Sequence, residues 1–212
     1  MKNNLSDVEQ RVKRYWYTDG IGELMGGGMS LVLGLYFALP EYLGEGSLLS
    51  TLLQSSLILV LIGGVFLAQR LINIVKTRLT YPRTGYVEYR STEQNSKWRR
   101  ILVMAVAMLI AMLSLIIARR IDAIDSMVAV TGVLVAVILT VKQAWSSRMR
   151  RFYILSAVSL ILGFGLSLSG LAKGYNLGLF YGLMGIAFAV SGGLTLQRYL
   201  RENPIPVEAE NE

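Results

Sequence analysis

Long stretches without a single charged residue constrain this chain more than any other feature. At about 1.5 Å per residue, an α-helix of roughly 20 apolar residues crosses a hydrocarbon layer about 30 Å thick. We therefore expect an all-α polytopic membrane protein, with six transmembrane helices arranged as three hairpins. The uncharged runs cover residues 24–40, 46–69, 101–118, 126–141, 152–172 and 174–197.

The composition supports a membrane environment. The chain is 53% hydrophobic and only 17% charged, whereas soluble domains carry roughly 25% charged residues. Too little polar material is present to cover a water-facing surface. The run 126–141 is the shortest, so we expect it to need a snorkelling Lys142, a thinner bilayer or shelter among other helices.

The positions of the basic residues predict the orientation. If successive runs cross in alternating directions, all of the 21 Lys and Arg residues except Arg119, Arg120 and Lys173 fall on one side. Basic residues collect on the cytoplasmic side of membrane proteins. We therefore expect both termini and the large middle loop to be cytoplasmic, in a multi-pass protein of the plasma membrane. The same bias accounts for the net charge of +7, and no nucleic-acid partner is expected.

The expected segments follow from these runs and from local signals. Residues 1–19 form a cytoplasmic interfacial helix, because Ser6 and Glu9 fit a capping box and Tyr15 and Trp16 suit the headgroup region. No cleavable signal peptide is expected, and the first run serves as an uncleaved anchor. After Pro204 the chain is acidic, and we expect the cytoplasmic tail 201–212 to be disordered. Within the transmembrane domain 20–200, the expected helices are 20–40, 50–76, 100–118, 126–143, 152–172 and 176–200, with a cytoplasmic loop over 77–99.

An internal repeat emerges when the sequence is compared with itself at an offset of about 129 residues. Residues 30–34 then match residues 159–163, and Gly63-Gly64 matches Gly192-Gly193. The first and last helix pairs therefore look like parallel copies of one hairpin. Chance matching of apolar sequence is the alternative.

Small residues recur at spacings that favour close helix contact. In a bilayer, helices associate through van der Waals packing, which small residues permit. A compact bundle explains these ridges, and contact between copies of the chain in a homo-oligomer is the alternative. The predicted packing glycines are Gly174, Gly178, Gly182, Gly185 and Gly193, with Gly22 and Gly26, Gly132, and Gly163 extending the pattern to other helices.

The middle loop opens with residues that favour turns and extended backbone. Pro82 and Gly85 suit bends, and the neighbouring Tyr, Thr and Val residues favour strands, so we expect a short β-hairpin over 79–89. The candidate contacts with a phosphate or a partner protein are Tyr81, Pro82, Arg83, Gly85 and Tyr86. A loop lying at the lipid headgroups without a specific partner is the alternative.

Asp19 and Glu23 are the acidic residues nearest to a predicted membrane span. Two acids at the start of a helix can cap its positive end. The alternative is a cation or proton site in a groove lined by the glycines around them. No ionisable residue lies deep within any of the runs, which argues against proton-coupled transport of ions.

Several chemistries lack their required residues. The chain has no histidine and no cysteine, which removes histidine- or thiolate-ligated zinc, Ser-His catalysis and haem ligation by histidine. Lys142 and Ser146 are one helical turn apart, but such pairs arise easily at a basic membrane edge. We therefore predict no enzymatic activity, no cofactor and no metal site.

The spacing of glycine and leucine over residues 28–34, followed by Pro40 and Gly63-Gly64, resembles the HdeD-like acid-resistance family of bacterial membrane proteins. That resemblance covers the first two and last two predicted helices, and it implies six helices built from two-helix repeats with a role in stress resistance. It supplies no catalytic residues. This chain differs by its long loop after the second helix and by its amphipathic N-terminal segment.

Two functions from different classes fit these features. The first is a small non-enzymatic membrane protein, structural or stress-related, that acts through contacts with lipids or with a protein at its cytoplasmic loop. The second is the membrane subunit of an ATP-driven exporter for neutral or lipophilic solutes. Flux in reconstituted vesicles would distinguish them.

Overall fold

The computed structural model describes residues 17–44, 47–84, 126–140 and 149–204, and all the regular structure in them is helical. The all-α prediction is confirmed for this part of the chain. The predicted third span 100–118, most of the interfacial helix 1–19 and residues 205–212 lie outside the described residues. The helices are α2 (Ile21–Leu43), α3 (Leu48–Ser55), α4 (Leu57–Leu79), α5 (Tyr81–Thr84), α7 (Ser126–Ile138), α9 (Arg150–Ser167) and α10 (Lys173–Glu202).

Four of the described helical segments are long and apolar enough to cross a membrane: Ile21–Leu43, Leu57–Arg83, Arg150–Ser167 and Gly174–Glu202. These segments correspond to α2, α4 with its α5 extension, α9 and α10. Helix α7 is shorter, at 13 residues.

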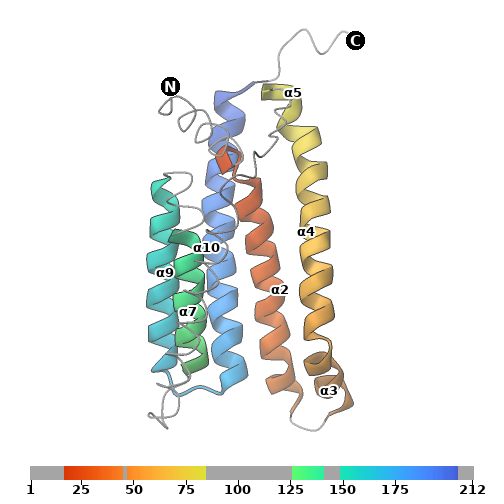
Figure 1. Cartoon of the computed structure of the whole chain (residues 1–212), viewed down its shortest axis with the longest axis vertical. Coiled ribbons are helices and arrows are strands. Elements are labelled where there is room, and N and C mark those ends of the chain that lie inside the picture. The colour runs from red at the N-terminus through yellow and green to blue at the C-terminus, as the bar shows by residue number, and fades with distance from the viewer. Residues whose placement is uncertain (1–16, 45–46, 85–125, 141–148, 205–212) are drawn as a thin grey trace, which may run out of the picture.

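Helix α10 lies in the middle of the bundle (Figure 1), with α2 on one side and α7 and α9 on the other, while α4 flanks α2. The first turns of α2 and α9 meet the last turns of α4 and α10 at one end. We call this the basic end. The described basic residues in the last turn of α4, in α5, in the first turn of α9 and in the last turns of α10 lie there: Lys76, Arg78, Arg83, Arg150, Arg151, Arg198 and Arg201.

Glycines let α2 and α10 approach at backbone contact. Glycines recur every seven residues along α2 and its N-cap, at Gly20, Gly27 and Gly34. They face Gly192, Gly185 and Gly178 of the antiparallel α10. A Cβ added at Gly27 would lie 2.9 Å from backbone atoms of Gly185 and Ala189. A seven-residue spacing keeps the contact on one stripe of each helix. We call this stripe the glycine seam.

Four of the predicted packing glycines, all on α10, lie along this contact. Gly174, Gly178 and Gly185 each meet α2, and Gly34 would touch the backbone of Gly182 if it carried a Cβ. At Gly193 a Cβ would meet open space, as it would at Gly22 and Gly26. The seam follows a seven-residue period and uses Gly192, Gly20 and Gly27, so Gly193, Gly22 and Gly26 take no part in the α2–α10 contact. Their contact with another part of the chain or with a second copy stays a prediction.

The second contact region joins α7, α9 and α10. Gly132 of α7 and Gly163 of α9 touch, since an added Cβ at either would lie within 3 Å of the other's Cα. Ser159 donates a hydrogen bond to the Gly132 carbonyl at 2.9 Å, and Ser156 donates to the Ala136 carbonyl at 3.1 Å. Helix α7 is thus sheltered by its neighbours. The buried core here consists of Val128, Leu139, Phe152, Leu155, Leu177, Phe180 and Met184.

The expected single helix over 50–76 is two helices, which corrects the prediction. Helix α3 begins after Ser47, whose side chain accepts from the Ser50 N–H, and it ends at Ser55. The hydroxyl of Ser55 bonds back to the Thr51 carbonyl and that of Ser56 to the Leu53 carbonyl. Such back-bonding serines bend helices. Helix α4 then continues to Leu79, past the expected start of the loop.

The predicted β-hairpin over 79–89 is wrong in its first half. Leu79 is the last residue of α4, and residues 81–84 form the short helix α5. Proline is tolerated in the first turn of a helix, where its missing N–H has no partner to lose. Residues 85–89 lie outside the described chain.

Candidate functional site

Asp19 is the first of two buried acids at the basic end, and it has three partners. One carboxylate oxygen accepts from the Ile21 N–H at 3.2 Å, at the start of α2. The other lies 3.2 Å from the Lys76 ammonium group and accepts from the Thr80 hydroxyl at 3.2 Å. The Asp19 side chain is 1% exposed and that of Lys76 is 5% exposed. Asp19 therefore joins the start of α2 to the end of α4.

Glu23, one turn further into α2, pairs with Arg151 at the start of α9. The two side chains approach to 2.8 Å as an ion pair, although Nε and Oε1 are not aligned for a hydrogen bond. The second Glu23 oxygen accepts from the Ser191 hydroxyl of α10 at 2.5 Å. Arg151 also donates to the Thr195 hydroxyl at 2.8 Å and to the Tyr17 carbonyl. Glu23 therefore joins α2 to α9 and α10.

We call Asp19, Glu23, Lys76 and Arg151 the ionic cluster. It contains two acids and two bases, and it links the basic-end termini of α2, α4, α9 and the nearby part of α10. Burying a charge is costly unless it is paired and hydrogen-bonded, and each carboxylate here has both kinds of partner. The arrangement gives the four helices one defined set of neighbours.

Tyr17 packs against the cluster from the segment before α2. Its ring meets Phe152 edge to face, with ring centroids 5.7 Å apart. Burial raises the pKa of the Tyr17 phenol above its usual value. Tyr17 contributes its backbone carbonyl oxygen to Arg151.

The sequence singled out Asp19 and Glu23 but not their partners. The Asp19 contact with the Ile21 N–H fits the helix-capping interpretation. For the alternative of a cation site, the structure places an ammonium group and a guanidinium group beside the two acids. The missed signal was that these acids lie on the predicted basic side, where cationic residues from other helices are close.

The loop candidates are only partly described. Arg83 donates to the Asn203 carbonyl at 2.8 Å, so it binds the C-terminal end of α10. A cation at this end is favourable for the helix dipole. Pro82 is exposed and Tyr81 is half-buried, while Gly85 and Tyr86 lie outside the described residues. The structure brings Arg83 close to the end of α10, separately from Asp19 and Glu23.

The opposite end of the bundle is joined by a different acid. Glu41, near the end of α2, accepts from the Gly174 N–H at 3.0 Å, at the start of α10. An acid at this position satisfies an N-terminal amide and the positive end of the helix dipole. Beside it, the buried Asn176 accepts from Ser169 at 2.7 Å and donates to the Leu171 carbonyl at 3.1 Å.

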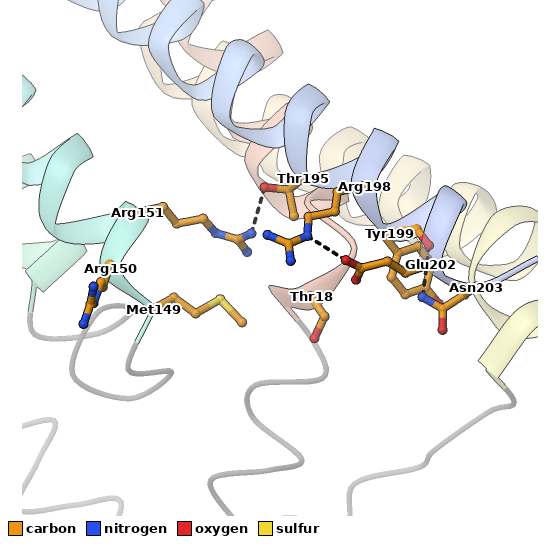
Figure 2. Close-up of a pocket in the computed structure, with 9 residues that line it drawn as sticks. All are labelled: Thr18, Met149, Arg150, Arg151, Thr195, Arg198, Tyr199, Glu202 and Asn203. Atoms are coloured by element: carbon orange, nitrogen blue, oxygen red, sulfur yellow. Dashed lines mark hydrogen bonds and ion pairs between the residues drawn. The ribbon is translucent and has the colours of Figure 1, made fainter.

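A cavity of about 520 Å³ opens at the basic end, between the start of α9 and the last turns of α10. Figure 2 shows Arg151 reaching toward Thr195, and Arg198 paired with Glu202 at 2.7 Å. Arg150 lines the same cavity and is exposed. We call this cavity the arginine pocket. Its lining residues are Thr18, Met149, Arg150, Arg151, Thr195, Arg198, Tyr199, Glu202 and Asn203.

The described residues hold no cluster of three or more acids that could bind a metal ion. Four described helices are apolar and long enough to span a membrane, and ion pairs join α2 to α4 and to α9, an architecture that is compatible with a helical integral membrane protein. No family model, no curated protein and no solved structure matches the chain.

Proposed function

We propose that this chain is a small integral membrane protein without enzymatic activity, structural or stress-related, that acts through contacts with lipids or another protein at the cytoplasmic surface. The ionic cluster is the observation that carries the proposal. Asp19 and Glu23 are buried, and each has a cationic partner from another helix. Their charges hold the helices together. A carboxylate that is already paired with a cationic side chain is not free to bind another cation or to act as an acid or base.

The proposed topology has six spans with both termini in the cytoplasm. Its support is that the start of α2 and the end of α10 lie at the same end of the bundle, together with the basic residues. By the positive-inside rule that end is cytoplasmic. The third span and the resemblance to the HdeD-like family remain predictions, as does the internal repeat.

Contact with a partner is proposed at the cytoplasmic segment that follows α4 and begins with α5. Helix α5 is held against the end of α10 by Arg83, which presents Pro82 at the surface. Residues near a rigid helix end offer a partner a defined surface.

The test uses the full chain, purified and reconstituted into vesicles. We expect no flux of neutral or lipophilic solutes, and a specific partner that co-purifies from native membrane. Replacing residues 81–86 by a Gly-Ser linker should remove the partner, whereas replacing 169–171 at the opposite end should not. Solute flux, or a partner retained by the 81–86 replacement, would contradict the proposal.

The alternative is the membrane subunit of an ATP-driven exporter, and the one-sided position of the ionic cluster favours it. Two buried ion pairs close the basic end, and breaking them would allow α4 and α9 to separate from α2. An inner gate requires such a breakable contact. Two results would support this alternative. Flux by the native chain should require a partner ATPase, and the variant Glu23→Gln should show increased flux without ATP.

A further inference from the structure

The arginine pocket carries more positive charge than the described acids around it neutralise. Three arginines line it, Arg150, Arg151 and Arg198, and Glu202 is the acid among the lining residues. Arg151 is paired with Glu23, and Arg198 with Glu202, but no described acid pairs with Arg150. Among the described residues, Arg150 is therefore the lining charge that no acid neutralises, and it attracts an anion.

The pocket also lies at a defined depth. Arg151 directly precedes the uncharged run 152–172, and Arg198 directly follows the uncharged run 174–197. Both residues therefore mark the boundary between the apolar part of the bundle and water. Lipid phosphates lie at this boundary in a bilayer, next to the hydrocarbon layer.

Exposed apolar ridges run from the pocket along both helices. On α10, Val190 and Leu194 precede Arg198 at four-residue steps and are 55% and 64% exposed. On α9, Ile154 follows Arg150 by one turn and is 65% exposed, and Ile161 lies two turns beyond at 71%. Residues four apart share one face of a helix. A chain of methylene groups could lie along either ridge.

We propose that the arginine pocket binds the phosphate headgroup of an anionic phospholipid, whose acyl chains lie along the exposed ridges of α9 and α10. The volume of about 520 Å³ has room for a glycerophosphate headgroup. Arginine pairs well with phosphate because its guanidinium group presents a planar fork of donors. The ridges favour a lipid over free phosphate, which would gain nothing from them.

This inference rests on the proposed function, because it needs the basic end to lie at the headgroups. The experiment embeds the full chain in nanodiscs of equal phosphatidylglycerol and phosphatidylcholine, and native mass spectrometry counts the lipids that stay bound. We expect the native chain to retain phosphatidylglycerol selectively. The variant Arg150→Gln/Arg198→Gln should retain about tenfold less phosphatidylglycerol than the native chain, because each basic residue near the membrane surface strengthens binding to anionic lipid.

The matched control is Arg78→Gln/Arg201→Gln, which removes two exposed arginines of the same end that do not line the pocket. It should retain phosphatidylglycerol as the native chain does. Glu202→Gln should increase retention, because it removes the acid in the lining. Equal loss in the pocket and control variants, or equal retention of both lipids, would overturn the inference.

Inorganic phosphate distinguishes the two sources of the anion. Millimolar phosphate should not displace the bound lipid, and full displacement would overturn the lipid assignment in favour of a free phosphate site. The proposed function fails separately. A chain that does not enter nanodiscs contradicts membrane embedding, whereas a chain that enters them without selecting phosphatidylglycerol contradicts only this inference.

Discussion

At the scale of single residues, Asp19 has the most demanding position in the described chain. It is buried, it accepts from a backbone amide, and it neutralises a lysine from a helix far along the sequence. Gly20, the next residue, has a left-handed backbone with φ 69°, and an added Cβ would lie 2.5 Å from the Gly192 carbonyl oxygen. Glycine is therefore required there by conformation and by space.

Removing one partner of the buried Asp19–Lys76 pair should destabilise the protein. We expect Asp19→Asn to lower the free energy of unfolding by about 3 kcal/mol, because the buried Lys76 ammonium group would lose the carboxylate charge that lies 3.2 Å away. The double variant Asp19→Asn/Lys76→Met should recover most of that loss. Thermal unfolding in detergent measures the stability of the single and the double variant.

The exposed pair Arg198–Glu202 provides the control. Its side chains are 80% and 59% exposed, so Glu202→Gln should leave the unfolding temperature unchanged. If Asp19→Asn also left it unchanged, the buried ion pair would make no net contribution to stability.

The sequence singled out Asp19 and Glu23 but not the side chains with which they pair. Asp19 and Glu23 could be found because charged residues are rare beside the apolar runs. Lys76 and Arg151 could not be assigned to them, since each pairing depends on how two helices are shifted and rotated against each other. The basic side holds many candidate cations, and sequence spacing does not rank them.

At the scale of elements, the glycine seam sets the distance between α2 and α10. We expect Gly27→Ala to lower the free energy of unfolding by about 1–3 kcal/mol, because its Cβ would press on backbone atoms that cannot move aside. Gly26→Ala is the matched control at the neighbouring position, where a Cβ meets open space. It should be neutral or stabilising, because alanine favours helix over glycine.

Chemical denaturation of the two variants in the same detergent gives the comparison. Equal stability of Gly27→Ala and Gly26→Ala would show that α2 and α10 can separate by the width of a methyl group without cost, which contradicts a seam closed at backbone distance.

Helix positions were easier to predict than helix contacts. The starts and ends of α2, α9 and α10 lie within a few residues of the expected helices, because charges and uncharged runs alternate clearly. The seam was harder, since glycines of α10 occur at spacings of both four and seven residues. Only the position of α2 shows that Gly178, Gly185 and Gly192 form the contact. The α3–α4 break depends on hydroxyl groups bonding back to the helix, which hydrophobicity does not record.

At the scale of the whole molecule, the absence of cysteine from the sequence makes the orientation easy to test. Ala172→Cys labels the α9–α10 connection and Pro204→Cys labels the chain after α10, and both positions are exposed. We expect a membrane-impermeant maleimide to react with Ala172→Cys in intact cells, and with Pro204→Cys only after the membrane is permeabilised. The reverse pattern would invert the proposed topology.

The ionic cluster also imposes an order on assembly. Glu23 is synthesised with the first helix, while its hydrogen-bond partner Ser191 follows 168 residues later. At about 5–20 residues per second, ribosomes need on the order of ten seconds to produce that stretch. In the proposed topology, Glu23 therefore has to stay at the water-facing edge of the first span until its partners on α9 and α10 have been made, because an unpaired buried charge is costly.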